Sequence, residues 1–228
     1  MKQKYTFQPD PFGVHYKTIQ SVPNGSYVLE IGCASGYLTR ELQKRGNTIV
    51  GVEINKNDAV QAEKYCTKII IGDIEDENTR NKIGIKKFDV IILVGILEHL
   101  KNPELVLRDM SQRLNPNGIV LLSVPNIVFL TNRLHYFLGR FDYTYTGIMD
   151  KTHLQFFTKK TFFQLIKTSG LKIIEFDYSG NFTQLPFYMQ TFYPLFKLKK
   201  WWRKIEHKLT GFWPQGLAVE FFLICKHP

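Results

Sequence analysis

Short runs of Val, Ile and Leu recur along the first half of the chain and predict buried β-strands. These runs occupy residues 27–31, 48–52, 68–71, 88–94 and 119–124. Apolar residues at helical spacing predict helices between the strands, over about 37–46, 58–64 and 103–114. Asn102 and Pro103 are typical of the N-cap and first turn of the last of these helices. The alternation predicts an α/β fold with a doubly wound, mainly parallel sheet.

This alternation stops after Pro125, where the chain becomes rich in aromatic and basic residues. One more helix and two more strands are expected beyond it, at 158–170, 172–178 and 218–225. We therefore expect one domain over residues 1–228 with two insertions, at 127–157 and 180–217.

The composition excludes several classes of protein. With 44% apolar and 22% charged residues in 228, the chain is globular rather than disordered. Its three cysteines (Cys33, Cys66 and Cys225) lack a CxxC spacing, which excludes a disulfide or zinc-finger framework and favours a reducing compartment. We see no secretory signal, and the longest apolar run, 90–97, is far shorter than the ~20 residues of a membrane span. A cytoplasmic protein is expected.

A glycine-rich turn follows the first predicted strand. Gly32 and Gly36 let the backbone approach a ligand, and the next helix begins there with free N–H groups, as in nucleotide sites. Glu53 closes the next strand, where a carboxylate can accept hydrogen bonds from both hydroxyls of a ribose. The glycine spacing is not GxGxxG, which argues against a dinucleotide site.

Residues 28–36, VLEIGCASG, resemble the first motif of class I S-adenosylmethionine-dependent methyltransferases. The resemblance continues in the expected order to about residue 125 and covers about 25–125. It implies a Rossmann-like, seven-stranded sheet with an antiparallel last strand, and S-adenosyl-L-methionine as the cofactor. It also implies the following cofactor-binding residues: Glu30, Gly32, Cys33, Ala34, Ser35, Gly36, Glu53, Ile54, Asp73, Ile74 and Val94.

Within this set, the resemblance gives Glu53 the ribose, Asp73 the adenine amine, and Ile54 and Ile74 the adenine ring. Ala34 stands where the family has a glycine, and its small side chain is expected to fit. An isolated acid of this kind is usually a solvated loop residue, but both acids follow predicted strands in the expected order, which favours the functional interpretation.

A second block, at 139–144 and 147–158, resembles a bacterial methyltransferase subgroup with a DxTHLxFFT motif. The subgroup is often tied to sugar, polysaccharide or lipid-linked glycan modification. The resemblance implies O-methylation of such an acceptor, with the two insertions forming an acceptor lid. RNA methylation and a cofactor-binding, non-catalytic partner subunit are the alternatives.

A hydroxyl acceptor needs a base, and histidine is the usual choice near neutral pH. We expect His153 to act as base or acceptor-orienting residue, with Asp150 fixing its tautomer and His99 near the reaction centre. The structural alternative makes Asp150 and His153 a helix N-cap with a hydrogen bond, and His99 a loop brace. His15 is expected in an N-terminal lid. The remaining histidines are expected at the surface: His135, His207 and His227.

Glu98 and His99 resemble the end of an ExxEH pattern that binds a divalent ion in some ubiquinone-biosynthesis and small-RNA methyltransferases. Gly95 stands in place of the first glutamate, and the loss of one carboxylate weakens a site for a hard cation. We therefore expect no metal. Cys33 has no neighbouring base in the sequence and is expected to be a small apolar filler.

The chain carries a formal charge of +10, with a pI of about 9.4. Residues 197–208 hold six Lys or Arg and one acid, which is half of that charge. Five apolar residues in this region have helical spacing: Leu195, Leu198, Trp202, Ile205 and Leu209. This stripe could pack on the domain while the lysines face solvent, or segment 195–209 could lie on an anionic membrane. Nucleic-acid binding is less expected, because no RNA motif accompanies the charge.

Overall fold

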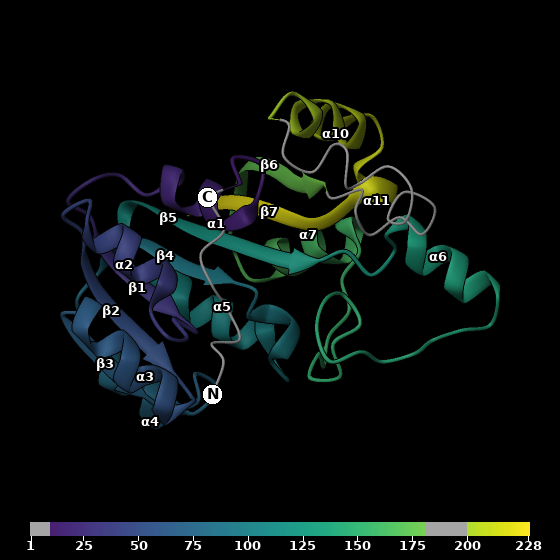
Figure 1. Cartoon of the computed structure of the whole chain (residues 1–228). Coiled ribbons are helices and arrows are strands. Elements are labelled where there is room, and N and C mark those ends of the chain that lie inside the picture. Colours follow the sequence, from purple (N-terminus) through teal and green to yellow (C-terminus); the bar gives the residue numbers. More distant parts are fainter. Residues whose placement is uncertain (1–9, 181–199) are drawn as a thin grey trace.

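The computed structural model describes residues 10–180 and 200–228 and contains a seven-stranded sheet in the order β3-β2-β1-β4-β5-β7-β6 (Figure 1). β7 pairs antiparallel with both β5 and β6, whereas the other pairs are parallel. The α/β fold with an antiparallel last strand is thus confirmed. The strands are β1 (Tyr27–Ile31), β2 (Thr48–Glu53), β3 (Lys68–Ile71), β4 (Phe88–Val94), β5 (Leu114–Pro125), β6 (Lys172–Gly180) and β7 (Ala218–Lys226).

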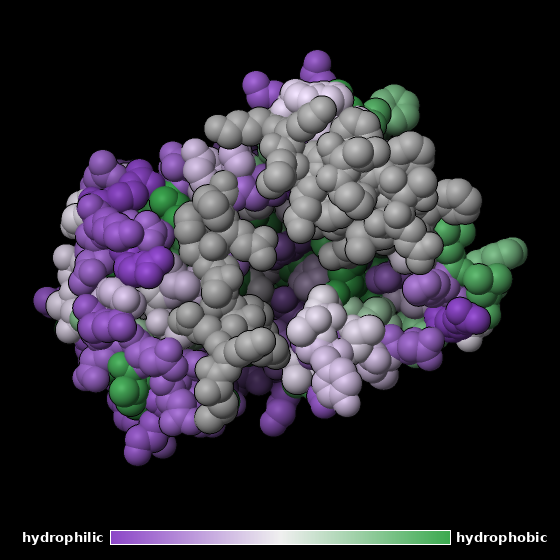
Figure 2. Space-filling model, in the orientation of Figure 1, coloured by the Kyte–Doolittle hydropathy of each residue, from purple (hydrophilic) through white to green (hydrophobic). Residues whose placement is uncertain are grey.

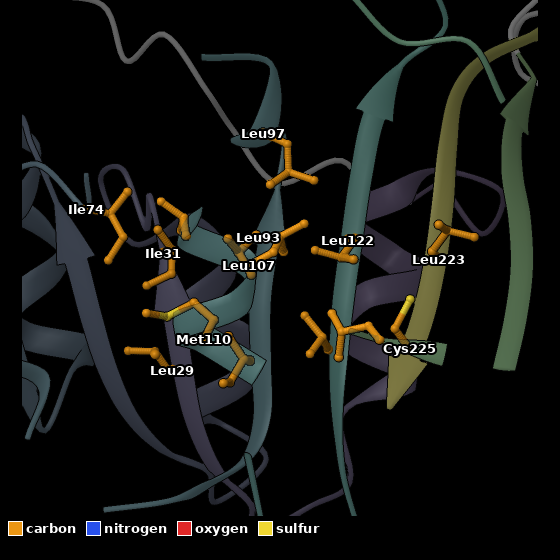
Figure 3. Packing of buried hydrophobic residues seen from close by; sticks show 14 of the residues in the cluster. Leu29, Ile31, Ile74, Leu93, Leu97, Leu107, Met110, Leu122, Leu223 and Cys225 are labelled. Atoms are coloured by element: carbon orange, nitrogen blue, oxygen red, sulfur yellow. The ribbon is translucent and has the colours of Figure 1, made fainter. Parts of the chain in front are cut away.

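Alternation along the strands separates the core into two layers. Val28 and Ile92 belong to a cluster with residues of α1 and α2, on one face of the sheet. Leu29 and Leu93 belong to the other cluster, with residues of α4, α5 and α7 (Figure 3). The helices are α1 (Val14–Ser21), α2 (Tyr37–Gln43), α3 (Lys56–Ala62), α4 (Glu77–Ile83), α5 (Pro103–Gln112), α6 (Leu130–Phe137), α7 (Lys159–Thr168), α10 (Lys200–Phe212) and α11 (Pro214–Leu217), with short 3-10 helices η1 (Glu63–Tyr65) and η2 (Leu97–His99).

Local signals located several helix ends correctly. The Asn102 side chain accepts a hydrogen bond from the Leu105 N–H at 3.1 Å and caps α5, as predicted. Thr158 caps α7 in a capping box, although the partner is Thr161 rather than an acidic residue. The pattern did not predict α1, α4 or α6, because each has only seven or eight residues and a weak apolar period.

Two local expectations were wrong. The strand expected at 119–124 begins earlier, since β5 starts at Leu114 and its pairing with β4 shifts register near there. His207, expected at the surface, packs between the rings of Phe12 and Tyr178 at centroid distances of 4.7 and 4.8 Å. Burial lowers the pKa of His207, because the charged form loses hydration. Helix periodicity shows which residues share a face but not which face turns inward.

The strand order reverses between β1 and β4. In open α/β sheets, the carboxyl ends of the strands beside such a reversal form a crevice where ligands bind. Among the described helices, none is long and apolar enough to cross a bilayer.

Candidate functional site

A cavity of about 780 Å³ opens at the carboxyl ends of β1, β2, β3 and β4. Its far wall comes from residues 146–153 of the first insertion, and His15 of α1 also lines it. The volume is within the range of small-molecule sites, roughly 300–1,000 Å³. Seven of the predicted cofactor residues line it: Gly32, Ala34, Glu53, Ile54, Asp73, Ile74 and Val94.

The turn after β1 is shaped by a close approach of backbone and side chain. Gly32 has φ +70°, and a Cβ there would lie 2.0 Å from the Cδ1 atom of Ile96. Ala34 has φ +46°, the left-handed region, and its N–H donates to Oε2 of Glu53 at 2.9 Å. Alanine therefore fits where the family has a glycine, with some backbone strain.

Both carboxylate oxygens of Glu53, at the carboxyl end of β2, are positioned by backbone hydrogen bonds. Its Oε1 accepts from the N–H of Asn55 at 2.8 Å, and only 8% of the residue is exposed. This hydrogen bond, together with the one that the Ala34 N–H donates to Oε2, fixes both carboxylate oxygens at the cavity wall. Each oxygen has a further lone pair, so the carboxylate can still accept hydrogen bonds from two ribose hydroxyls.

The adenine side is formed by the loops after β2 and β3. Ile54 and Ile74 line the cavity together with Asp73, whose Oδ1 accepts from the Glu75 N–H at 2.9 Å. Apolar side chains and a carboxylate suit a purine ring with an exocyclic amine. The residues present therefore fit the cofactor that the resemblance implies.

Four predicted cofactor residues, Glu30, Cys33, Ser35 and Gly36, do not line the cavity. Glu30 is buried beneath the turn, where it accepts a hydrogen bond from the Thr39 hydroxyl at 2.7 Å. Burial raises the pKa of Glu30 to about 7. Its contact with the cofactor stays a prediction.

Gly36 and Cys33 have packing roles in this region. A Cβ on Gly36 would lie 2.9 Å from the Cα of Ala62, so the glycine lets α2 approach α3. Contact with the Cys66 thiol and burial raise the pKa of Cys33, so it stays a thiol. The sequence-based interpretation of Cys33 as a filler agrees with this environment.

The structure brings His99 and His153 together at the other end of the cavity. The N–H groups of Leu154 and Gln155 donate to the backbone carbonyl of Glu98 at 2.7 and 3.0 Å. These two bonds join η2 to the first insertion and place the imidazole centroids 4.9 Å apart. Both rings line the cavity.

Backbone carbonyls define the tautomers of both rings. Nδ1 of His153 lies 3.0 Å from the Ile148 carbonyl oxygen, and Nδ1 of His99 lies 3.2 Å from that of Thr152. Because a carbonyl oxygen only accepts, each Nδ1 carries the proton in the neutral ring, which leaves a lone pair on Nε2. In this tautomer, Nε2 is the ring nitrogen with basic character.

Asp150 is hydrogen-bonded to Thr152 beside the two histidines. Its Oδ1 accepts from the N–H and the hydroxyl of Thr152 at 2.9 and 2.7 Å. Nδ1 of His153 lies against a backbone carbonyl, and the role of Asp150 in fixing its tautomer stays a prediction. The alternative of a helix N-cap at Asp150 was wrong, because the next helix, α7, begins at Lys159.

Four acids of the cavity wall were not predicted as site residues: Asp58, Glu75, Glu98 and Glu220. Glu98 is 3% exposed, and burial together with Glu220 raises its pKa to about 8. Glu220 of β7 accepts from the Ser123 hydroxyl at 2.6 Å, and burial raises its pKa as well. Glu98 stands inside a recognisable motif, whereas nothing around Glu220 in the sequence indicates a site.

Glu98, His99 and His153 offer ligand atoms that lie within 4.8 Å of one another. One carboxylate and two imidazoles form a donor set that suits first-row transition metals better than Mg²⁺. The sequence-based expectation of no metal considered only the donors near Glu98 and His99. The fold brings His153 to them as a third donor. The expectation of no metal stays a prediction.

The second insertion is placed differently from the first. Its described part, 200–217, supplies no residue to the cavity wall, and α10 lies against β6 instead. Only the first insertion, 127–157, thus has the position that an acceptor lid requires among the described residues.

The chain matches a family model described as "Methyltransferase domain" over residues 17–175. It is 29% identical over 104 residues to the ubiquinone biosynthesis O-methyltransferase of Azorhizobium caulinodans, a match that spans 45% of this chain and 41% of that protein. The protein of the same name from Coxiella burnetii is 23% identical over 171 residues, 73% of this chain and 72% of that one.

Solved structures with the same fold cover nearly the whole chain. A SAM-dependent methyltransferase from Archaeoglobus fulgidus has a TM-score of 0.62 at 16% identity, with 92% of this chain and 90% of that one covered. The [4+2]-cyclase SpnF also has a TM-score of 0.62, at 12% identity, with 100% and 85% covered. The fold alone therefore does not determine the reaction.

Proposed function

The chain belongs to the methyltransferase family whose model it matches and uses S-adenosylmethionine, and on that premise we propose that it methylates a hydroxyl oxygen of a sugar, glycan or lipid-linked small molecule. The pair of histidines in the cavity supports this proposal most directly. Both keep a lone pair on Nε2, and both share one cavity with Glu53. The names of the curated relatives, which are O-methyltransferases, agree with an oxygen acceptor.

The protein's part in the reaction is to bind, orient and remove a proton. S-adenosylmethionine supplies an activated methyl group on a sulfonium with a good leaving group. Glu53 and Asp73 would hold the nucleoside end, and His99 and His153 line the same cavity, where an acceptor hydroxyl could be oriented. The base would take the hydroxyl proton on Nε2 while the oxygen–carbon bond replaces the carbon–sulfur bond, whose electron pair stays on the sulfur of the departing thioether.

We assign the base to His153, with His99 as the orienting residue. The hydrogen bonds from the N–H groups of Leu154 and Gln155 to the Glu98 carbonyl hold the loops that carry the two imidazole rings. The rings are therefore positioned before the acceptor binds. Asp150 is a positioning residue, because it holds Thr152, whose carbonyl orients His99.

The charges of the cavity wall favour a neutral acceptor over a polyanion. One lysine and three histidines line the cavity, against seven acids. The acids are Glu53, Asp58, Asp73, Glu75, Glu98, Asp150 and Glu220. Glu98, with a pKa of about 8, is mostly protonated at neutral pH, but the other carboxylates still disfavour phosphates, which argues against RNA although the whole chain is basic. Hydroxyl groups of a sugar can donate to these carboxylates.

Labelled methyl from the cofactor tests the proposal. Cell extract is supplied with the protein and labelled S-adenosylmethionine, and the lipid, glycan and RNA fractions are counted. Labelled methyl in the lipid or glycan fraction that resists alkali, as a methyl ether does, supports the proposal. Labelled methyl in the RNA fraction supports the RNA methyltransferase alternative. His153→Ala is expected to lower turnover by about 10²–10⁴-fold while cofactor affinity stays unchanged.

The non-catalytic partner alternative makes a different prediction. It expects cofactor binding without turnover in any fraction, and His153→Ala would then change nothing. A matched control is His135→Ala, which replaces a histidine of α6 that does not line the cavity.

We also propose a peripheral contact of segment 195–209 with an anionic membrane, at the inner face, since a lipid-linked acceptor stays in a bilayer. Leu195 and Leu198 lie outside the described residues. In the described part, Lys204 and Lys208 are exposed, which agrees with attraction to anionic lipid.

A further inference from the structure

Helix α10 presents apolar side chains to solvent and polar side chains to the protein. Ile205 and Leu209 are 37% and 47% exposed, and Phe212 is 94% exposed, whereas Glu206 and Thr210 are almost fully buried. Of the predicted stripe, Leu195 and Leu198 lie outside the described residues and Trp202 is half-buried, so only the part at Ile205 and Leu209 departs from the expected packing on the domain. An amphipathic helix on a globular protein normally has the opposite orientation.

Specific contacts fix this orientation. A Cβ on Gly180 would lie 2.1 Å from the Thr210 hydroxyl, so α10 rests directly on the end of β6. Arg203 donates to the Gly180 carbonyl at 3.0 Å and forms ion pairs with Asp10 and Glu206. Rotation of the helix to bury the stripe would break all of these contacts and leave the Glu206 carboxylate without them.

The outward apolar residues extend beyond α10. The guanidinium of Arg133 lies 5.4 Å from the centroid of the Trp213 ring, which joins the end of α10 to α6. On α6 and directly after it, Phe137 is 89% and Leu138 is 66% exposed. Figure 2 shows apolar side chains over α10 at the top and over the end of α6 at the right. We call the following residues the docking surface: Ile205, Leu209, Phe212, Phe137 and Leu138.

We propose that the docking surface seats on an anionic lipid bilayer, with its apolar side chains in the interfacial region and Lys204 and Lys208 at the lipid phosphates. Exposed apolar side chains in such number mark an interaction site. The two exposed lysines beside them select an anionic, apolar partner, which is the composition of an interfacial helix. A second copy of this surface would place these lysines close to like charges.

This inference deepens the proposed function, because a lipid-linked acceptor would be reached from this position, but its physical basis is independent of the reaction. α10 and α6 lie outside the cavity wall, and no residue of the docking surface lines the cavity. Membrane binding can therefore be measured without any acceptor.

Co-sedimentation of the full chain with vesicles tests the proposal. One set contains phosphatidylcholine only, and the other contains equal parts of phosphatidylcholine and phosphatidylglycerol. We expect binding to the anionic set at low salt and weak binding to the neutral set. Leu209→Ser with Phe212→Ser should lower the partition coefficient by about tenfold or more, and Lys204→Gln with Lys208→Gln by about fivefold for each charge.

The control is Ile85→Ser, since Ile85 is 97% exposed in the turn between α4 and β4, outside the docking surface. It should bind vesicles like the wild type, and all variants should bind S-adenosylhomocysteine with unchanged affinity, which shows that they fold. Absence of binding to anionic vesicles would overturn the inference. So would a dimer in analytical ultracentrifugation that the Leu209 and Phe212 substitutions abolish. Failure of methyl transfer with intact vesicle binding would instead count against the proposed reaction alone.

Discussion

Replacement of Glu53 by alanine tests the cofactor site where its geometry is most specific. The carboxylate accepts from the N–H groups of Ala34 and Asn55 at 2.9 and 2.8 Å, and Glu53 lines the cavity. Hydrogen bonds to a charged acceptor contribute about 1.5–3 kcal/mol, so their loss should raise the Kd of the cofactor by about ten- to hundredfold. Isothermal titration with S-adenosylhomocysteine measures this change directly.

The same substitution also removes two acceptors from the turn after β1. We expect a loss of about 1–3 kcal/mol in unfolding free energy, because the N–H of Ala34 is left without its partner. Glu53→Gln retains one acceptor oxygen and should fall between wild type and Glu53→Ala. Glu41→Ala, in α2 and outside the cavity wall, is the control for general effects of losing a glutamate. An unchanged Kd in Glu53→Ala would remove Glu53 from the site and refute the reasoning.

Three other predictions concern stability and metal. Glu30 has a folded pKa of about 7 against an ordinary value of 4.5, so its contribution to stability is full below pH 4.5 and is lost as the pH rises through 7. Chemical denaturation of the cofactor-free protein should show this slope, up to about 1.4 kcal/mol per pH unit, and Glu30→Gln should reduce it; an equal slope in both would contradict the assignment. Ala34→Gly relieves a positive φ and should leave the melting temperature unchanged or higher, whereas Ala59→Gly within α3 should cost about 1 kcal/mol; equal losses would exclude the strain. EDTA should leave methyl transfer unchanged, and activity lost to EDTA but regained with Mn²⁺ would make Glu98, His99 and His153 metal ligands.

Much of the cofactor half of the site could be predicted from the sequence, because it is built from strand ends that follow one another along the chain. Gly32, Glu53 and Asp73 each lie at the carboxyl end of a strand with a clear apolar run or within two residues of it, and parallel strands bring these ends to one edge. The acceptor half could be predicted only in part. His99 and His153 were recognised within motifs, but their 4.9 Å proximity depends on backbone bonds between two loops.

Glu220 is a cavity residue that the sequence alone did not predict. It stands in the last strand, and it reaches the cavity only because β7 inserts between β5 and β6 in the sheet. No local pattern encodes that neighbour, since strand order depends on how crossover connections pack.

Helix α10 gives the same lesson for the surface. The spacing of Ile205 and Leu209 correctly indicated one apolar stripe, because periodicity follows from 3.6 residues per turn alone. The side on which the stripe lies was decided by Arg203, Glu206 and Thr210, which contact partners as distant in the chain as Asp10 and Gly180. The sequence by itself determined the sheet, its family and the cofactor motifs, which rest on local periodicity and on residues close along the chain. Only the tertiary structure decided which histidine nitrogens lie against backbone carbonyls and which face of a basic helix is exposed, because both depend on contacts between remote segments.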